Sequence, residues 1–327
     1  MTKLVTIFGG SGFIGRYIAH RMAKRGWRVR VAVRRPNEAI FVKTYGVVGQ
    51  VEPILCNIRD DASVEEALNG ADAVVNCVGI LIEDKKNTFA AVQHSGAERI
   101  GRLSTELGIK SLVHISAIGA DENSSSIYSS TKAKGENAIV SNFPNAVILR
   151  PSIVFGQEDQ FFNRFAKMAT MAPVLPLIAD TRGRPVFVDD VAKAAEAALL
   201  GGSVPKGIYE LGGPEIKDFR ELMILMLKII KRRRLIINTP RFIAKLMAFA
   251  LSTLQMLTLG LFKNSIITSD QIENLGIDNI VSEKAKGFET LNIDPLDMGS
   301  ILPEYLWRYR PSGQYDAIKD SAKNLRS

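Results

Sequence analysis

Short apolar runs alternate with longer amphipathic segments over the first 150 residues of the chain. The apolar runs are rich in β-branched residues and are predicted strands, at 3–8, 28–33, 51–56, 72–79, 111–116 and 145–150. The clearest predicted helices between them lie at 12–24, 88–107 and 129–142. Strands that alternate with helices predict a parallel sheet with right-handed crossovers. The predicted fold class is therefore α/β, a Rossmann-type doubly wound parallel sheet.

The pattern becomes less regular after residue 150. It predicts a short strand and a helix over 184–200, a strand and turn over 207–214, and a helix over 218–230. We interpret the segments at about 157–185 and 214–239 as a small α/β lobe of the substrate-binding type, interleaved with the Rossmann domain. The predicted domains are residues 1–239, which bind NADP, and residues 240–327, an amphipathic helix with an extended docking segment. From about residue 276 we expect irregular structure that needs a partner surface for order.

A basic segment at 228–234 precedes a long apolar stretch. No charged residue occurs from Leu246 to Phe262, but polar residues such as Ser252 and Gln255 interrupt the stretch. A helix of this kind fits a partner surface or the membrane interface better than a complete span of a bilayer. A lid helix packed on the small lobe is an equally good interpretation, and the sequence leaves both open.

Composition restricts the class of protein further. The chain has 327 residues, of which 46% are hydrophobic, enough for a large core. Cys56 and Cys77 lie in apolar runs, so we expect buried thiols in a reducing compartment, and with three scattered His they offer no metal-ligand spacing. A strand follows Met1 and Thr2 directly, which favours a bacterial cytoplasmic protein without a presequence.

The net charge of +8 indicates an acidic partner. Phosphates, anionic lipid headgroups and an acidic protein face all fit that charge. The sequence contains no nucleic-acid-binding module, and basic residues do not alternate with aromatic ones as in single-strand binders. Nucleic acid is therefore not an expected partner.

Three glycines follow the first predicted strand at a fixed spacing. Gly9, Gly12 and Gly15 lie in the run GGSGFIG, between a strand and a helix. Glycine lets the backbone turn tightly and approach a pyrophosphate, and the helix N-terminus supplies free N–H groups. The motif at the first strand-to-helix turn favours a dinucleotide site over a purely structural turn.

Two arginines end the second predicted strand, where NAD-binding proteins have a carboxylate. Arg34 and Arg35 occupy this place, and Arg16 follows the last glycine of the motif. Guanidinium groups suit a 2′-phosphate through charge-assisted, often bidentate hydrogen bonds. We therefore predict NADPH or NADP as the cofactor; the alternative is that one or both arginines are merely solvated.

A tyrosine and a lysine four residues apart carry the candidate catalytic chemistry. Tyr128 and Lys132 share a helix face, and the ammonium can tune the phenol as a proton donor. Ser116 adds a hydroxyl at the end of the fifth predicted strand. The alternative is that Lys132 binds ribose hydroxyls and Tyr128 packs over the nicotinamide without turnover.

Several motifs in this order resemble the short-chain dehydrogenase/reductase superfamily, in its extended or atypical branch. They are GGSGFIG, NCVG (76–79), HISAIG (114–119), YSSTK (128–132), LRPSIVFG (149–156) and VFVDDVA (186–192). Longer runs resemble, more narrowly, the NADP(H)-binding accessory subunits of respiratory complex I, the NADH:ubiquinone oxidoreductase. That likeness covers most of residues 1–280 and is most specific from Ile148 to Ala169.

The resemblance implies a role for each residue that matches a family motif. The pyrophosphate contacts would be Gly9, Ser11, Gly12, Phe13, Ile14, Gly15 and Arg16, and the 2′-phosphate contacts Arg34 and Arg35. Asn57 and Ile58 would flank the adenine, and Val78 and Gly79 would back the ribose. Ser116, Tyr128 and Lys132 match the catalytic triad and the cofactor contacts, and Pro151, Ser152 and Ile153 would line the nicotinamide. Gln93 and His94 stand where relatives commonly carry a proton-relay Asn.

The resemblance also implies a function. We expect an accessory subunit of complex I that holds a structural NADPH without turning it over, on the cytoplasmic face of a bacterial inner membrane. Its partners would be complex I subunits near the quinone-binding module and anionic lipid headgroups, with this chain as a monomer in the hetero-oligomer. An active NADP-dependent oxidoreductase or epimerase, acting on a nucleotide sugar or a quinone precursor, is the first alternative. A redox sensor that responds to the NADPH/NADP ratio is the second.

Overall fold

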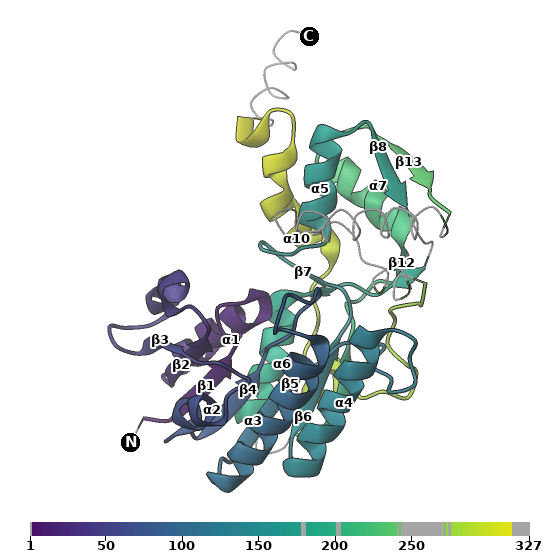
Figure 1. Cartoon of the computed structure of the whole chain (residues 1–327). Coiled ribbons are helices and arrows are strands. Elements are labelled where there is room, and N and C mark those ends of the chain that lie inside the picture. The colour runs from purple at the N-terminus through teal and green to yellow at the C-terminus, as the bar shows by residue number, and fades with distance from the viewer. Residues whose placement is uncertain are drawn as a thin grey trace. The chain divides into compact units, whose positions relative to one another are not determined.

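The chain forms two compact units in the computed structural model (Figure 1). The structure describes residues 2–177, 181–200, 204–240 and 276–315, with the single positions 242, 270 and 273. The first unit comprises residues 1–152, 188–212 and 281–295, and the second comprises 153–187, 213–280 and 296–327. Most of the apolar stretch at 240–263 lies outside the described residues, so the helix expected there and the domain limits near residue 239 stay predictions.

A seven-stranded parallel sheet forms the centre of the first unit. Its strands run in the order β11-β6-β5-β4-β1-β2-β3. Their bounds are β1 (Leu4–Phe8), β2 (Arg28–Val33), β3 (Val51–Leu55), β4 (Ala73–Asn76), β5 (Ser111–Ile115), β6 (Val147–Pro151) and β11 (Gly207–Leu211). All six strands predicted before residue 150 are present, and β11 extends the sheet beside β6. The prediction of a doubly wound Rossmann-type α/β fold is confirmed.

Helices cover this sheet because each connection crosses from one parallel strand to the next. They are α1 (Phe13–Lys24), the 3-10 segment η1 (Pro36–Tyr45), α2 (Asp61–Leu68), the π-turn η2 (Ala90–His94), α3 (Ser95–Glu106), α4 (Ile127–Asn142), α6 (Val188–Leu200) and η3 (Phe288–Leu291). Figure 1 shows α3 and α4 side by side. They and α2 share an apolar cluster with the sheet that includes Leu68, Ile100, Leu112, Ile139 and Ile148. Arg21 joins α1 to α6 through Asp189 and Glu196.

One predicted helix differs from its expected form. The pattern predicts a continuous helix over 88–107, whereas a π-turn at Ala90–His94 precedes α3. The backbone of Gln93 in this turn passes directly against α4, and a Cβ at Gly135 would lie 2.2 Å from the Gln93 carbonyl oxygen. Gly135 in α4 thus leaves room for the wider turn at Gln93. This contact joins residues far apart in sequence, so helical periodicity does not predict it.

The described residues of the second unit form three short two-stranded sheets around an apolar core. The pairs are β7 (Val154–Phe155) with β10 (Val186–Phe187), β8 (Val174–Leu177) with β13 (Leu235–Asn238), and β9 (Arg182–Gly183) with β12 (Lys217–Asp218). Its helices are α5 (Phe162–Met171), α7 (Phe219–Ile229) and α10 (Met298–Leu306), followed by the 3-10 turns η4 (Trp307–Tyr309) and η5 (Gly313–Tyr315). Phe155, Phe162, Leu222, Met226 and Leu302 are buried together in its core.

The expectation of irregular structure beyond residue 276 is wrong for α10. Asp297 caps this helix by accepting a hydrogen bond from Ser300 N, and Leu302 and Leu306 are fully buried. The Tyr305 hydroxyl donates to Asp159 Oδ2 at 2.5 Å inside the same unit. Pro303 lies within the helix and weakens its sequence signal, but the burial of one apolar face stabilises it.

Two arginines of the basic segment at 228–234 are used within the second unit. Arg232 Nε donates to the carbonyl of Tyr309 at 2.8 Å, and Arg234 Nε donates to the carbonyl of Ala169 at 2.7 Å. Part of this basic charge therefore holds neighbouring backbone in place, in addition to any role at the surface.

Residues 281–295, which we call the C-terminal strap, return to the first unit and cover the edge of its sheet at β11. Glu210 N donates to Lys286 O at 2.9 Å, and Tyr209 and Lys286 form a parallel bridge. Phe288 and Leu291 in the strap are buried. Because an uncovered edge strand invites pairing with other chains, the strap protects this edge.

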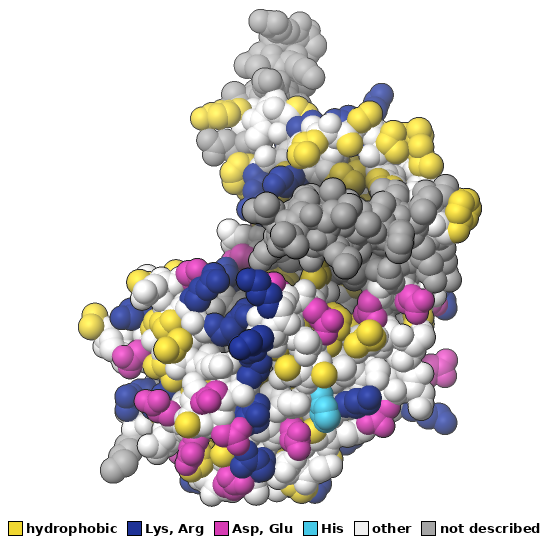
Figure 2. Space-filling model, in the orientation of Figure 1, with side chains coloured by type: hydrophobic (Ala, Val, Ile, Leu, Met, Phe, Trp, Pro, Cys, Tyr) yellow, Lys and Arg dark blue, Asp and Glu magenta, His cyan; other side chains and the backbone are white. Residues whose placement is uncertain are grey.

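Charged side chains are unevenly distributed over the face of the first unit that Figure 2 shows. Lys and Arg side chains follow one line down this face, with Asp and Glu side chains on both sides. Within the described ranges, no helix combines the length and the apolar character that crossing a lipid bilayer requires.

Candidate functional site

The predicted nucleotide-binding residues of the first unit gather at the carboxyl edge of its sheet. β1 is followed by Gly9, β2 by Arg34, β4 by Cys77 and β5 by Ser116. The strand order reverses at β1, with β2 and β3 on one side and β4, β5, β6 and β11 on the other. In open α/β sheets the crevice at such a reversal is where ligands bind. Chain segments far apart in sequence thus meet at one candidate site.

The glycine motif forms a tight loop into the N-terminus of α1. Gly9 has φ +72°, and a Cβ at Gly15 would lie 2.5 Å from Gly9 O and 2.7 Å from Gly10 Cα. Gly12 is the N-cap residue, no side chain of the described residues caps α1, and its first turn contains no acidic residue. The free N–H groups and partial positive charge of this helix end fit a pyrophosphate.

The other predicted residues of this loop have separate places. Ser11 precedes the N-cap, and Phe13 and Ile14 form the first turn of α1, all partly buried. Arg16 Nη2 donates to Ser11 O at 3.0 Å, and its guanidinium lies 4.9 Å from the ring centroid of Phe41. Arg16 therefore holds the glycine loop in place, in addition to its predicted contact with the phosphate of the ligand.

The two arginines after β2 differ in their surroundings. Both are exposed, but Arg35 Nη1 donates to Glu38 Oε1 at 3.0 Å, an ion pair three residues apart along the chain. The side chain of Arg34 has no hydrogen bond or ion pair within the described part of the chain. Arg34 is thus the less encumbered partner for a 2′-phosphate.

This difference yields a prediction about nucleotide preference. Arg34→Ala should weaken NADPH binding by about tenfold or more, the value of one charge-assisted hydrogen bond, and leave NADH binding nearly unchanged. Arg35→Ala should have a smaller effect, because Glu38 already shares the charge of Arg35. Calorimetric titration of both variants with NADPH and NADH measures this, and an equal loss of both nucleotides with Arg34→Ala would contradict the assignment.

The predicted adenine contacts lie in a well-bonded loop after β3. Asn57 Oδ1 accepts hydrogen bonds from Arg59 N at 3.2 Å and Arg59 Nε at 3.4 Å, and Asn57 N donates to Ser63 Oγ at 3.0 Å. Ile58 is buried, and its side chain would lie 3.1 Å from a Cβ at Gly96. The loop therefore has little freedom to move.

The predicted ribose contacts lie beside the candidate catalytic lysine. Val78 N donates to Asn76 Oδ1 at 3.0 Å, which fixes the chain after β4. Gly79 is exposed, and a Cβ there would lie 3.5 Å from Lys132 Nζ. The geometry thus brings the ammonium of α4 to the segment predicted to back a ribose.

Lys132 has the environment of a buried, tuned ammonium. It is 5% exposed, and Nζ donates to the carbonyl of Ile115 at 3.0 Å. Burial lowers its pKa to about 8, although the nearby carboxylate of Glu136 opposes this shift. One N–H bonds Ile115 and the other donors have no hydrogen-bond partner among the described residues, so they can bind ribose hydroxyls.

The other members of the predicted triad are Tyr128 and Ser116. The Tyr128 ring is partly buried and packs edge-on to Phe89, with centroids 5.9 Å apart. Ser116 is 4% exposed, and its Oγ has no hydrogen-bond partner among the described residues. A buried hydroxyl without a partner is costly, so Ser116 suits a ligand atom or a water at this place.

Pro151 and Ser152 continue this edge of the first unit. Pro151 ends β6, and Ser152 N donates to Leu211 O at 2.9 Å. Both residues are buried. Ile153, the third residue predicted at the nicotinamide, is the first residue of the second unit.

Gln93 is fixed by packing where relatives commonly place a proton-relay Asn. It is 2% exposed, its Nε2 donates to Ile80 O at 2.8 Å, and Thr131 Oγ1 donates to its Oε1 at 3.3 Å. The amide therefore ties the chain after β4 to α4. Its neighbour His94 ends the π-turn.

Sequence reasoning missed a buried polar pair beneath this site. His114 on β5 and Asn76 on β4 are paired in register, and Asn76 Nδ2 lies 3.1 Å from His114 Nδ1. Burial lowers the pKa of His114 to about 3, so its ring is neutral, and Nε2 has no partner in the described ranges. A polar residue in the last two positions of each of two adjacent apolar strands is the sequence signal that could have identified the pair.

The expectation of buried thiols holds for Cys56, and for Cys77 it holds for the thiol group although the residue as a whole is partly exposed. Cys56 is buried, whereas Cys77 is partly exposed. The reason is that β4 ends at Asn76, so Cys77 already belongs to the loop at the sheet edge. Burial raises the pKa of Cys56 to about 11 and that of Cys77 to about 12, so neither thiol is an activated nucleophile.

The buried ammonium of Lys132 predicts that stability depends on pH. Its pKa is about 8 in the folded protein and 10.5 in a model peptide, so between these values the unfolded chain binds more protons. The free energy of unfolding should therefore rise with pH in this window, by at most about 3 kcal/mol. Urea unfolding of nucleotide-free wild type and Lys132→Met from pH 7 to 10 measures it. A constant difference between the two proteins across the window would contradict the prediction.

Comparison with known proteins gives two kinds of match. Residues 2–217 match the RmlD substrate binding domain family. The chain is 33% identical over 317 residues to the NADH dehydrogenase (ubiquinone) 1 alpha subcomplex subunit 9, mitochondrial, of Arabidopsis thaliana, covering 95% of this chain and 79% of that protein. It is 30% identical over 321 residues to the mitochondrial NADH-ubiquinone oxidoreductase 40 kDa subunit of Neurospora crassa, covering 98% and 83%.

A solved structure shares the fold at lower identity. The UDP-glucose 4-epimerase of Thermus thermophilus, determined in complex with NAD, superposes with a TM-score of 0.60 at 22% identity, covering 72% of this chain and 86% of the epimerase. This likeness agrees with the short-chain dehydrogenase/reductase architecture and carries no statement about substrate.

Proposed function

The chain belongs to the RmlD substrate binding domain family of the short-chain dehydrogenase/reductase type, together with the 40 kDa and alpha subcomplex 9 subunits of NADH-ubiquinone oxidoreductase, and on that premise we propose that it is an accessory subunit of respiratory complex I. The observation that carries this proposal is the extent of the similarity to those subunits. It covers 95% and 98% of this chain, well beyond the nucleotide-binding motifs that all members of the superfamily share.

The proposed ligand is NADPH, held at the carboxyl edge of the sheet. The glycine loop and the open N-terminus of α1 suit the pyrophosphate, and Arg34 suits the 2′-phosphate. When bound, this nucleotide would supply a hydride donor, but in a structural role its effect is to stabilise the folded unit. A ligand at a thousandfold excess over its Kd adds about 4 kcal/mol to the free energy of unfolding.

Three features of the site support holding rather than turnover. Gln93 is occupied by Ile80 O and Thr131, so it offers no relay in place of the usual Asn. Lys132 has donors left for ribose hydroxyls, and Tyr128 packs against Phe89. These side chains can bind and orient the nicotinamide half without a substrate.

Catalytic turnover is the second candidate, and a specific observation favours it. Ser116, Tyr128 and Lys132 all retain the residue types of the superfamily's triad, and the pKa of Lys132 is lowered to about 8, in the range useful for proton transfer at neutral pH. This alternative requires a small-molecule substrate, such as a nucleotide sugar or a quinone precursor.

The proposed setting is peripheral, on the cytoplasmic face of a bacterial inner membrane. The relatives that support a respiratory setting are named mitochondrial, so they lend no support to the bacterial part of this proposal. The chain would be one copy within the complex, next to subunits of the quinone-binding module. Residues 240–327 would serve in docking, and the net charge of +8 would favour acidic subunits or anionic headgroups.

Purification through a tag on this chain tests the proposal. In mild detergent we expect the whole NADH:ubiquinone oxidoreductase to copurify, with released nucleotide that absorbs at the wavelength of reduced nicotinamide. Tyr128→Phe should retain NADPH and respiratory activity, which separates holding from turnover. Recovery of the chain alone, or lost respiration with an assembled Tyr128→Phe complex, would overturn the structural role.

A further inference from the structure

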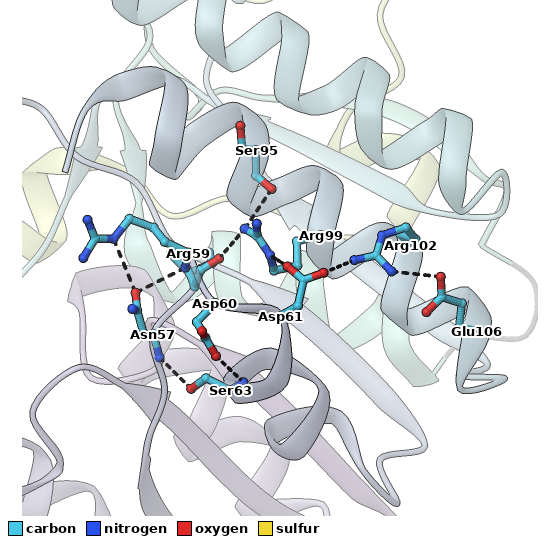
Figure 3. A network of polar contacts seen from close by, with 10 residues as sticks. Asn57, Arg59, Asp60, Asp61, Ser63, Ser95, Arg99, Arg102 and Glu106 are labelled. Atoms are coloured by element: carbon cyan, nitrogen blue, oxygen red, sulfur yellow. Dashed lines mark hydrogen bonds and ion pairs between the residues drawn. The ribbon is translucent and has the colours of Figure 1, made fainter. Parts of the chain in front are cut away.

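Four charged side chains on α2 and α3 form a continuous series, which we call the charged ladder: Asp61, Arg99, Arg102 and Glu106 (Figure 3). The Arg99 and Arg102 guanidinium groups each bind one oxygen of Asp61, and Arg102 Nη1 donates to Glu106 Oε1 at 2.9 Å. The two arginines thus share a single carboxylate, which fixes the orientation of both.

The inner end of the ladder reaches the loop after β3. Arg99 Nη1 donates to the backbone carbonyl of Ile58 at 2.9 Å and contacts Ser95 O at 3.3 Å. The Arg99 side chain is 19% exposed, whereas Asp61 is 55% exposed. Arg99 therefore connects the first turn of α3 to the backbone of the segment that is predicted to flank the adenine.

Two further hydrogen bonds hold the same loop. Arg59 Nη1 donates to Lys86 O at 2.9 Å, and Asp60 caps α2 by accepting from Ser63 N at 2.8 Å. Below the loop, Gly96 leaves room for the side chain of Ile58. These bonds fix Asn57 and Asp60, and among the described residues the hydrogen bond from Arg99 is the one that holds the carbonyl of Ile58.

The ladder contributes little to stability as a set of surface ion pairs. Asp61, Arg102 and Glu106 are each at least 40% exposed, and exposed pairs are worth well under the value of a buried contact. The ladder instead fixes the orientation of the Arg99 guanidinium toward the Ile58 carbonyl. This points to a role in placing the Ile58 backbone rather than in holding α2 and α3 together.

We propose that Arg99 is a positioning residue for the adenosine half of the bound dinucleotide. It acts through the Ile58 carbonyl and is itself held by Asp61, without touching the ligand. This inference rests on the proposed function, because it needs a nucleotide at the carboxyl edge of the sheet. Loss of the guanidinium releases the Ile58 carbonyl, so this part of the adenine platform must be ordered at the moment of binding, which weakens affinity.

Binding of the full-length protein to NADPH and to 2′,5′-ADP, which is the adenosine half alone, tests the proposal after removal of copurified nucleotide. We expect Arg99→Ala to weaken both ligands by the same factor, about tenfold, the value of one charge-assisted hydrogen bond. Arg99→Lys should recover only part of this, because an ammonium cannot contact Ile58 O and Asp61 in the fixed fork of a guanidinium. Glu98→Ala, at an exposed neighbouring position on α3, and Glu106→Gln, at the outer end of the ladder, should bind within about twofold of wild type.

Asp61→Asn keeps the test decisive if Arg99→Ala does not fold. It changes an exposed side chain, removes the charge that orients Arg99, and should weaken 2′,5′-ADP more than Glu106→Gln does. Wild-type affinity for 2′,5′-ADP in both Arg99→Ala and Asp61→Asn would overturn the positioning role alone. A wild-type protein that binds neither NADPH nor 2′,5′-ADP would overturn the proposed function and this inference with it.

Discussion

Replacing Gly15 by alanine should abolish measurable nucleotide binding while the rest of the sheet stays folded. The added Cβ would lie 2.5 Å from Gly9 O and 2.7 Å from Gly10 Cα, and both of these are backbone atoms. A backbone cannot rotate away as a flexible side chain can, so the loop or α1 must move. The N–H groups that suit a pyrophosphate then lose their common direction. A displacement near 1 Å at such a site costs on the order of 100-fold in function.

Calorimetry with NADPH and the melting temperature with and without ligand measure this effect. Wild type should melt at a higher temperature with NADPH, and Gly15→Ala should show no such rise. Lys24→Ala is the control, because Lys24 is exposed in the last turn of the same helix and such changes usually shift stability by less than about 0.5 kcal/mol. Near wild-type affinity in Gly15→Ala would show that the nucleotide does not bind at the N-terminus of α1.

The sheet of the first unit was predictable because its signals are local. Each buried parallel strand is a short, nearly continuous apolar run. The glycine motif lies at a strand-to-helix turn, where it is typical of pyrophosphate binding. The strand order then follows from the few topologies that right-handed crossovers allow. Consequently the placement of Gly9, Arg34 and Ser116 along one edge of the sheet could be inferred from the sequence alone.

Several contacts that refine the site were not predictable, because they join residues far apart in sequence. Arg99 and Asp61 are 38 positions apart, and Gln93 meets Thr131 across a similar interval. Arg102 and Glu106, four residues apart on α3, do carry a local signal. The π-turn could not be predicted from the sequence for the same reason, because it depends on Gly135 in another helix.

The difference between Arg34 and Arg35 shows what the structure adds to a sequence motif. In the sequence the two are adjacent and equivalent. In the structure Arg35 is paired with Glu38, while Arg34 has no such partner in the described ranges. The motif therefore predicts the chemistry of the ligand, and the neighbouring carboxylate decides which residue is available for it.

Replacing Glu136 by alanine should cause the largest loss of stability among the substitutions considered for the first unit. Glu136 is 2% exposed and accepts two hydrogen bonds from Arg150, at 2.9 Å from Nε and 2.6 Å from Nη2. The pair also raises the pKa of Arg150, through the hydrogen bonds to Glu136 before any other favourable cause. Removing one member leaves a largely buried charge uncompensated, which costs about 3–5 kcal/mol.

The lower end of that range, about 3 kcal/mol, is the expected value because a second carboxylate remains. Arg150 Nη1 lies 3.6 Å from Glu210 Oε1, and Glu210 Oε2 also accepts from Ser282 N in the C-terminal strap. With Glu136 absent, Arg150 should turn toward Glu210 and compete for it. The strap should then loosen, so limited proteolysis within residues 281–295 should be faster in Glu136→Ala than in wild type.

Urea unfolding and proteolysis of Glu136→Ala, Arg150→Met and the double variant separate the causes. The double variant should be more stable than Glu136→Ala, because it removes the unpaired charge together with its partner. Glu98→Ala, which removes an exposed carboxylate from α3, controls for the loss of one negative charge. If the double variant were as unstable as Glu136→Ala, the cost would come from lost packing in α4. The strap would then depend on its buried Phe288 and Leu291 rather than on the charges of Arg150, Glu136 and Glu210.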